Sequence, residues 1–277
     1  MSDSAYYPVI HGHRGCRGLR PENTLSAFRY AVQLGVEVIE LDVVVSADNR
    51  VVVSHEPWMS ATICRTPAGL PISPAEQYAH NLYALPYAEI RRYDCGLTRH
   101  PAFLEQQPEP AYKPLLSEVV HNLDSLAGEL GRAPVRYSIE LKSDPAADGL
   151  FQPLPGRFLE LVLQELRASQ VLPRTTLLCF DKRILQLAHR QLPMLPLCLL
   201  VEDVQPFSQH LEQLGFTPAV YGPQHHLVTP ELAAELAGLA VQLVPWTVND
   251  PGDFKRLLAL RPAGITTDYP NRFLPAR

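Results

Sequence analysis

Two histidines precede an arginine in a short polar stretch near the N-terminus. Residues 11–15 read His-Gly-His-Arg-Gly and follow an apolar run that begins at Val9. Residues two apart in a β-strand face the same side, so His11 and His13 share one face and Arg14 follows where the strand ends. A histidine can move a proton near neutral pH, and an arginine can hold a phosphate through two hydrogen bonds. The stretch indicates either an acid–base site for an anion or a polar loop whose glycines serve only the turn.

Acidic side chains lie on two other apolar segments. Glu40 and Asp42 share one face of the segment 38–42, and Glu140 lies two residues before Lys142 in a similar segment. Neighbouring carboxylates on a buried face are costly unless a cation lies between them, and oxygen ligands suit a hard divalent cation. We therefore predict a metal site at Glu40, Asp42 and Glu140, with Lys142 available to an anionic ligand. The alternatives are a solvated carboxylate face and a surface Glu–Lys pair.

Two valine-rich runs on either side of Asp48 and Asn49 predict a β-hairpin. With these two residues at the centre of the turn, Asp42 pairs with His55 across the hairpin. Cross-strand partners have Cβ atoms roughly 5 Å apart on the same face, so His55 would join the carboxylates. A three-residue loop would shift this register by one residue.

Apolar strand-like runs alternate with helix-periodic runs along most of the chain. The strand candidates are Val9–His13, Glu37–Asp42, Tyr137–Lys142, Thr175–Phe180, Pro196–Val201, Ala219–Pro223, Val241–Val248 and Gly264–Asp268. The helix candidates are Thr24–Leu34, Leu115–Leu130, Arg157–Ser169, Lys182–Gln191, Phe207–Leu214, Pro230–Ala240 and Gly252–Leu260. This alternation predicts an α/β fold, a (β/α)8 TIM barrel, because the rival, a doubly wound open sheet, lacks its phosphate-binding fingerprint here. In such a barrel the chemistry lies at the carboxyl ends of the strands, where Trp246 either lines the mouth or packs at the rim.

Composition limits the class of protein. The chain has 277 residues, of which 46% are hydrophobic and 19% are charged, and its net charge is −5. This composition suits a single barrel domain over residues 1–277 and disfavours nucleic acid as a partner. The sequence has no apolar run long enough for stable membrane insertion, and its start has no signal-peptide pattern. We therefore expect a cytoplasmic protein, or a periplasmic or secreted one if a signal peptide has been removed.

Two further features concern cysteine and proline. Five cysteines, an odd number, predict free thiols in a reducing compartment rather than a disulfide framework. Residues 57–114 are rich in Pro and Tyr and predict a long insertion after the hairpin. The aromatic side chains of this insertion either form an apolar wall at the mouth or pack the insertion onto the barrel; they are Tyr78, Tyr83, Tyr87 and Phe103.

The motifs together resemble the glycerophosphodiester phosphodiesterase family. The resemblance rests on HRGCRGLRPENTLSAF and VEVIELDVVVSADNRVVVSHE, followed in the family's order by SIELK, CFD, PWTVND and GITTDYP, and it spans His13 to Pro270. It implies a TIM barrel that hydrolyses glycerophosphodiesters to glycerol 3-phosphate and an alcohol, with one divalent metal ion, Mg²⁺ or Ca²⁺. The family usually has Asp after the second histidine, where this chain has Glu56.

The resemblance also implies roles for individual residues. His13 and His55 would be the acid–base pair of a reaction that proceeds through a cyclic phosphate, and Glu40, Asp42 and Glu140 the metal ligands. Arg14 and Lys142 would contact the phosphate, Trp246 would contact the substrate, and Glu22 and Asn23 would order the loop after the first strand. The alternatives are a lysophospholipase D, which acts on lysophospholipids, and a non-catalytic module that binds glycerophosphodiesters. The oligomeric state and the alcohol stay open.

Overall fold

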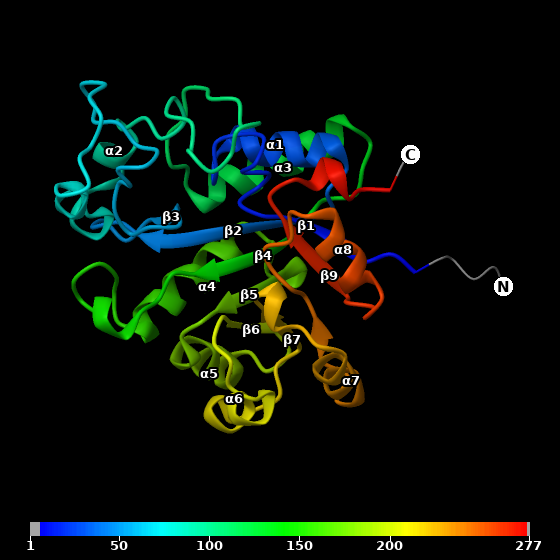
Figure 1. Ribbon diagram of the computed structural model, residues 1–277. Helices are drawn as coiled ribbons and strands as arrows, with labels where there is room; N and C mark the ends of the chain where they lie inside the picture. Colours follow the sequence, from blue (N-terminus) through cyan, green and yellow to red (C-terminus); the bar gives the residue numbers. More distant parts are fainter. Residues whose placement is uncertain (1–5, 276–277) are drawn as a thin grey trace.

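The apolar runs of the sequence form the strands of a nearly closed barrel in the computed structural model, which describes residues 6–275 (Figure 1). Eight parallel strands follow the order β8-β7-β6-β5-β4-β2-β1-β9, which confirms the predicted α/β barrel. Their bounds are β1 (Val9–Gly12), β2 (Val38–Val45), β4 (Arg136–Leu141), β5 (Thr175–Cys179), β6 (Leu197–Val201), β7 (Val220–Pro223), β8 (Gln242–Leu243) and β9 (Gly264–Thr267).

The barrel closes irregularly between β8 and β9. The predicted strand Val241–Val248 is too long, because only Gln242 and Leu243 are in ladder geometry. Pro245 has no amide hydrogen to donate, which ends regular pairing. Single backbone hydrogen bonds close the gap instead, among them the one from the Thr266 amide to the Pro245 carbonyl at 3.0 Å.

Helices follow the strands and cover the outside of the barrel, except α2, which belongs to the insertion at residues 57–114. They are α1 (Leu25–Leu34), α2 (Tyr87–Ile90), α3 (Leu116–Glu129), α4 (Pro155–Ala168), α5 (Lys182–Gln191), α6 (Phe207–Leu214), α7 (Pro230–Gly238) and α8 (Pro251–Leu258). Short 3₁₀ helices are η1 (Gln77–Ala79), η2 (Leu82–Ala84), η3 (Pro145–Ala147), η4 (Leu172–Arg174), η5 (His225–Leu227) and η6 (Pro270–Arg272). Side chains of Thr24, Asp181, Thr229 and Asp250 cap α1, α5, α7 and α8. None of the helices between residues 6 and 275 is long and apolar enough to cross a membrane.

The predicted hairpin forms, but its register differs from the prediction by one residue. β2 pairs with the antiparallel strand β3 (Val51–Val53) through Val43↔Val53, Val44↔Val52 and Val45↔Val51. The loop contains three residues, since the Ser46 amide donates to the Arg50 carbonyl and Asn49 takes the left-handed conformation with φ 59. The Ser54 amide consequently donates to the Asp42 carbonyl, so Ser54 rather than His55 lies opposite Asp42.

The insertion at residues 57–114 packs beyond the carboxyl end of β2 (Figure 1). It buries a cluster of its own with β2 and β3, which includes Met59, Leu82 and Ile90. Cys64 and Cys95 form a disulfide there, with Cα atoms 4.0 Å apart. The prediction of free thiols is therefore wrong for this pair and correct for the three buried cysteines Cys16, Cys179 and Cys198. An odd count leaves one cysteine unpaired but does not say which others approach one another in space.

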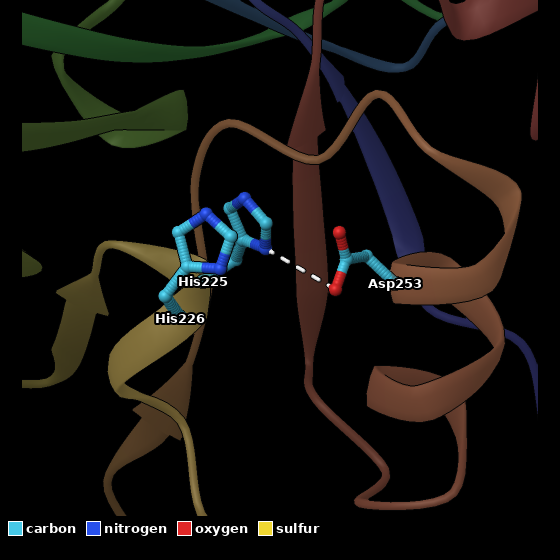
Figure 2. A group of neighbouring side chains, drawn as sticks. All are labelled: His225, His226 and Asp253. Carbon is cyan, nitrogen blue, oxygen red and sulfur yellow. Dashed lines mark ion pairs between the residues drawn. The ribbon is translucent and has the colours of Figure 1, made fainter.

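Successive side chains along a strand point alternately toward the helices and into the barrel, and in β2 this separates apolar from acidic residues. Ile39 and Leu41 of β2 join the main core between strands and helices, whereas Glu40 and Asp42 point into the barrel. A smaller apolar cluster fills the opposite side of the interior; it consists of Leu178, Cys198, Leu200 and Val220. At the carboxyl ends of later strands, η5 brings His225 and His226 beside Asp253 of α8 (Figure 2).

Candidate active site

The register of three neighbouring strands brings the polar residues together. β2 and β4 pair Asp42 with Glu140, and β1 pairs Gly12 with Ile39 of β2. The next residues, His13 and Glu40, are therefore neighbours, with His13 Nε2 3.9 Å from Glu40 Oε2. Because the strands are parallel, their carboxyl ends lie at the same end of the barrel, and side chains far apart in sequence converge there.

The three predicted carboxylates form one buried group. Oxygen atoms of Glu40, Asp42 and Glu140 lie within 4.8 Å of one another, and all three residues are buried. Burial, followed by repulsion from Asp42 and Glu140, raises the pKa of Glu40 well above its usual value. Burial likewise raises the pKa of Glu140, although Lys142 opposes the shift. Such a group favours a bound cation, and its oxygen donors suit Mg²⁺ or Ca²⁺.

Arg14 adopts the left-handed conformation, with φ 48, and is surrounded by these acids. Its amide donates to Glu40 Oε2 at 2.8 Å, its Nη1 donates to Glu22 Oε1 at 2.7 Å, and its Nε lies 3.2 Å from Asp42 Oδ2. Asn23 also has positive φ and donates from Nδ2 to Asp42 Oδ2 at 2.9 Å. Glu22 and Asn23 thus tie the loop after β1 to the carboxylate group, as predicted.

Lys142 lies at the end of β4 and faces the same group. Its Nζ donates to Glu140 Oε1 at 2.5 Å and is 3.9 Å from Asp42 Oδ1. Although burial would lower it, the pKa of Lys142 is raised by Glu140 and Asp42. Opposing charges hold the pKa of Asp42 below its usual range despite burial, with Arg14 the largest of them and His55 next. Asp42 is therefore ionised at neutral pH.

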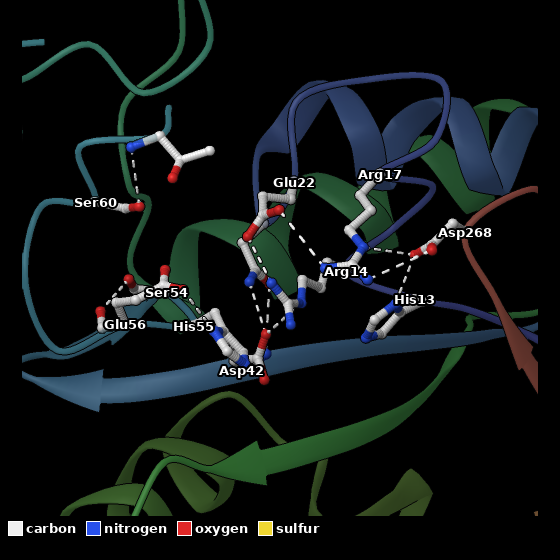
Figure 3. Close-up of polar contacts among 12 residues, drawn as sticks. His13, Arg14, Arg17, Glu22, Asp42, Ser54, His55, Glu56, Ser60 and Asp268 are labelled. Atoms are coloured by element: carbon white, nitrogen blue, oxygen red, sulfur yellow. Dashed lines mark hydrogen bonds and ion pairs between the residues drawn. The ribbon is translucent and has the colours of Figure 1, made fainter. Parts of the chain in front are cut away.

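His13 is positioned by a contact with Asp268, the residue that follows β9. Its Nδ1 is 2.6 Å from Asp268 Oδ1, and Arg17 and Asn249 donate to the same carboxylate at 2.7 Å each. Figure 3 shows this contact between the His13 ring and Asp268. Burial and the neighbouring Arg17 lower the pKa of His13 to about 4, although Asp268 opposes them. His13 is therefore neutral at pH 7.

His55 lies on the other side of Arg14 from His13 (Figure 3). Its Nδ1 is 2.8 Å from Glu56 Oε1, and hydrogen bonding and charge from His55 help to lower the pKa of Glu56 to about 2 despite burial. Ser54 Oγ donates to the Glu56 carbonyl at 2.6 Å and accepts from Lys113 Nζ at 2.8 Å. Lys113 is buried at the end of the insertion. These contacts of Ser54 with Glu56 and Lys113 hold the loop after β3. His55 therefore stays beside the carboxylate group, although the hairpin register differs from the prediction by one residue.

A cavity of about 850 Å³ opens over these residues. It is lined by charged and aromatic side chains, which are His13, His55, Arg14, Arg17, Glu140, Lys142, Trp58, Phe180 and Trp246. Trp246 Nε1 donates to the Gly222 carbonyl at 2.7 Å, and its ring meets Phe180 edge to face. The cavity thus has a charged side and an aromatic side.

The four aromatic residues suggested as a wall of this cavity do not line it, and Tyr83 packs against the main core instead. Tyr78 packs against Trp58, and Tyr87 is buried and donates to Glu118 Oε2. Phe103 packs against Tyr269 and beneath Arg17. These side chains pack the insertion onto the barrel, which was the alternative interpretation.

Sequence reasoning missed several residues of the site. Asp268 holds His13 with help from Arg17 and Asn249, and Lys113 supports the loop of His55 through Ser54. None of these four residues was assigned to the site from the sequence. The pairing of β1 with β9 could have indicated the contact between His13 and Asp268. Gly12 lies opposite Thr267, so the next residues on the two strands, His13 and Asp268, are neighbours. Lys113 gave no signal, since it contacts Ser54 across 59 residues of sequence.

Comparison with known proteins agrees with this geometry. Residues 13–272 match the model of the Glycerophosphoryl diester phosphodiesterase family. A glycerophosphodiester phosphodiesterase of Bacillus altitudinis is 29% identical over 97% of this chain and 97% of its own length. A crystal structure from Silicibacter pomeroyi that carries the family's name is 32% identical, with a TM-score of 0.86 over 97% of this chain and 92% of that one. A phosphodiesterase of Oleispira antarctica, solved with the product sn-glycerol-3-phosphate, shares the fold at 20% identity, with a TM-score of 0.74 over 96% of this chain and 95% of that one.

The family match covers nearly the whole barrel, including both histidines and the three carboxylates. The chain therefore belongs to the glycerophosphoryl diester phosphodiesterase family.

Proposed function

We propose that this chain hydrolyses glycerophosphodiesters to glycerol 3-phosphate and an alcohol, with a divalent metal ion and with His13 and His55 as the acid–base pair. The observation that carries the proposal is a single cavity lined by both imidazoles, beside three buried carboxylates whose oxygens lie within 4.8 Å of one another. Membership of the family and the sn-glycerol-3-phosphate named as the product of the Oleispira antarctica protein support this substrate class.

Glu40, Asp42 and Glu140 fit a hard divalent ion, Mg²⁺ or Ca²⁺. Their donors are all oxygens and come from adjacent strands, and burial together with the neighbouring carboxylates raises the pKa values of Glu40 and Glu140. When bound there, such an ion supplies positive charge to the phosphoryl oxygens.

In the first step, we propose that the glycerol 2-hydroxyl attacks phosphorus. The new O–P bond forms while the bond from phosphorus to the alcohol oxygen breaks, giving a cyclic phosphate. His13 is neutral and oriented by Asp268, which suits acceptance of the hydroxyl proton. The charge of a bound phosphate would raise the pKa of His13 toward neutrality. His55, paired with Glu56 on the other side, would give its proton to the departing alcohol.

In the second step the two histidines exchange roles. His55 would take a proton from water as the water oxygen bonds to phosphorus, and His13 would return its proton to the 2-oxygen as the ring opens. The products are glycerol 3-phosphate and the free enzyme with both imidazoles restored.

Arg14 and Lys142 would hold the phosphate, since both cations line the cavity beside the carboxylates. Trp246, with Phe180 and Trp58, would contact the alcohol on the aromatic side of the cavity.

The test is a hydrolysis assay with glycerophosphocholine, glycerophosphoethanolamine, glycerophosphoinositol and a lysophospholipid. We expect release of glycerol 3-phosphate, loss of activity in EDTA, and recovery when Mg²⁺ or Ca²⁺ is added. Full activity in chelator would contradict the metal site. Preference for the lysophospholipid would favour a lysophospholipase D, and binding of all substrates without turnover would favour a non-catalytic module.

A further inference from the structure

A second group of metal-ligating side chains lies outside the cavity described above. His225 and His226 belong to η5, which follows β7, and Asp253 belongs to the first turn of α8 (Figure 2). One ligand atom from each residue lies within 4.8 Å of the other two. The rings of the two histidines are close, with their centroids 3.8 Å apart.

His225 is the informative member of the group, because its polar atom is buried without a partner. The residue is 9% exposed, and across residues 6–275 its Nδ1 has no hydrogen-bond partner. This nitrogen points toward Asp253 Oδ1 but remains 3.7 Å away, which is too far for a hydrogen bond (Figure 2). Buried polar atoms are nearly always satisfied, so an unsatisfied one beside a carboxylate calls for an explanation.

A shared ion accounts for this spacing. Bonds of about 2.0–2.2 Å from zinc to nitrogen and oxygen place two ligands of a tetrahedral ion roughly 3.3–3.5 Å apart. The 3.7 Å between His225 Nδ1 and Asp253 Oδ1 is close to this separation.

We propose that His225, His226 and Asp253 bind a borderline transition-metal ion, typified by Zn²⁺ or Co²⁺, at a site separate from the three-carboxylate group. Two imidazoles and one carboxylate favour such ions over Mg²⁺ and Ca²⁺, which prefer oxygen ligands. A water molecule would complete a four-coordinate ion, because His226 is exposed and leaves one side open.

Arg256 limits the affinity. Its Nη2 is 3.3 Å from Asp253 Oδ1, and its guanidinium also donates to the carbonyls of His225 and Val228. The arginine therefore shares the carboxylate with the ion, and we expect weaker binding than at a closed structural zinc site.

The position of the site gives it a structural consequence. The ion would join η5 to α8, and the amide of His225 donates to the Trp246 carbonyl at 2.7 Å. Trp246 lies in the irregular segment after the short strand β8 and lines the cavity. An ion at this site would therefore brace the part of the barrel where regular strand pairing is missing.

The test is a Co²⁺ titration of the full chain in excess Mg²⁺, followed by the visible absorption of four-coordinate Co²⁺. Mg²⁺ occupies oxygen sites and leaves the histidine site free. We expect the wild type to show the Co²⁺ bands, and His226→Gln and Asp253→Asn each to weaken Co²⁺ binding about tenfold or more. His121→Gln, which changes an exposed histidine of α3, is the matched control and should titrate like the wild type.

Two further measurements separate this site from the other one. Glu140→Gln should keep the Co²⁺ bands, and Zn²⁺ should raise the Tm of the wild type and of His121→Gln but not of His226→Gln. His226 is exposed, so its variant is expected to fold with an unchanged metal-free Tm. Co²⁺ bands that survive in His226→Gln and Asp253→Asn, or that disappear only in Glu140→Gln, would overturn the proposal.

Discussion

Both candidate catalytic histidines are held in the same way, although the residues that hold them come from different parts of the chain. A carboxylate contacts Nδ1 in each case: Asp268 at 2.6 Å for His13 and Glu56 at 2.8 Å for His55. In each case this contact fixes the orientation of the imidazole ring and leaves Nε2 free to exchange a proton in the cavity. The departure from the family pattern at Glu56 preserves this contact.

Replacement of either histidine should remove activity with little loss of stability. We expect His13→Ala and His55→Ala each to lower kcat by about 10²–10⁴. Stability should change little, because Asp268 keeps its contacts with Arg17 and Asn249, and His55 is only half-buried. Steady-state kinetics and thermal unfolding check this, with His121→Ala as control. A variant that retains most of its kcat would exclude that histidine from the reaction.

Asp268→Asn tests the positioning of His13. The amide cannot stabilise the protonated imidazole and can hold the wrong tautomer, so we expect kcat to fall by about 10²–10⁴ while KM changes little. The control is Asp250→Asn, which alters only the cap of α8. Equal losses of kcat and of Tm in the two variants would reduce Asp268 to a structural role, whereas an altered pH profile in Asp268→Asn alone would support positioning.

At the scale of elements, the barrel strands place the carboxylates and the insertion secures one histidine. Asp42 and Glu140 are level because β2 pairs in register with β4, and Glu40 lies two residues earlier on the same face of β2. His55 lies past the end of β3, so its position depends on the contact between Lys113, at the end of the insertion, and Ser54.

Lys113→Met should therefore loosen the loop that carries His55. The substitution keeps most of the volume but removes the donor to Ser54 Oγ, and Ser54 in turn donates to the Glu56 carbonyl. We expect a fall in kcat of about tenfold, since misplacement of a catalytic group by a fraction of an ångström is costly. Steady-state kinetics check this against Lys255→Met, an exposed change on α8. Unchanged kcat would mean that Glu56 alone holds His55.

At the scale of the whole molecule, burial inside the barrel disfavours the charged form of a titratable side chain. A cavity of about 410 Å³ inside the strands is lined by His11 and Ser138, by apolar residues such as Leu178 and Leu200, and by charged residues that include Glu40, Glu140 and Arg136. Burial, and next the charge of Arg136, lower the pKa of His11 to about 3. The interior therefore keeps His11 neutral across the physiological range.

This shift predicts that acid weakens the fold through His11. Between the unfolded pKa of about 6.5 and the folded pKa of about 3, the unfolded chain binds a proton that the folded chain does not, so stability falls as pH falls. We expect the stability of the wild type relative to His11→Gln to decline by a few kcal/mol from pH 7 to pH 4. Urea unfolding at several pH values measures this difference, and a pH-independent difference would contradict a neutral buried His11.

Much of the molecule could be predicted from the sequence because its signals are local. Alternation of apolar runs with helix-periodic runs identified all eight barrel strands, and the helix starts predicted at Pro230 and Gly252 lie within one residue of the starts of α7 and α8. His13, Glu40, Asp42 and Glu140 could be chosen because polar residues at the ends of buried strands require a compensating partner.

Contacts between distant segments could not be read in this way. The sequence by itself determined the barrel class and pointed to the three carboxylates, His13 and Arg14 as candidates for the site, since backbone periodicity and the cost of burying charge act on neighbouring residues. Only the tertiary structure decided the register of the hairpin, the Cys64–Cys95 disulfide, and the support given to the histidines by Asp268 and Lys113. These features depend on loop length and on how separate segments pack, and the free energies that select among such packings are shared over many residues.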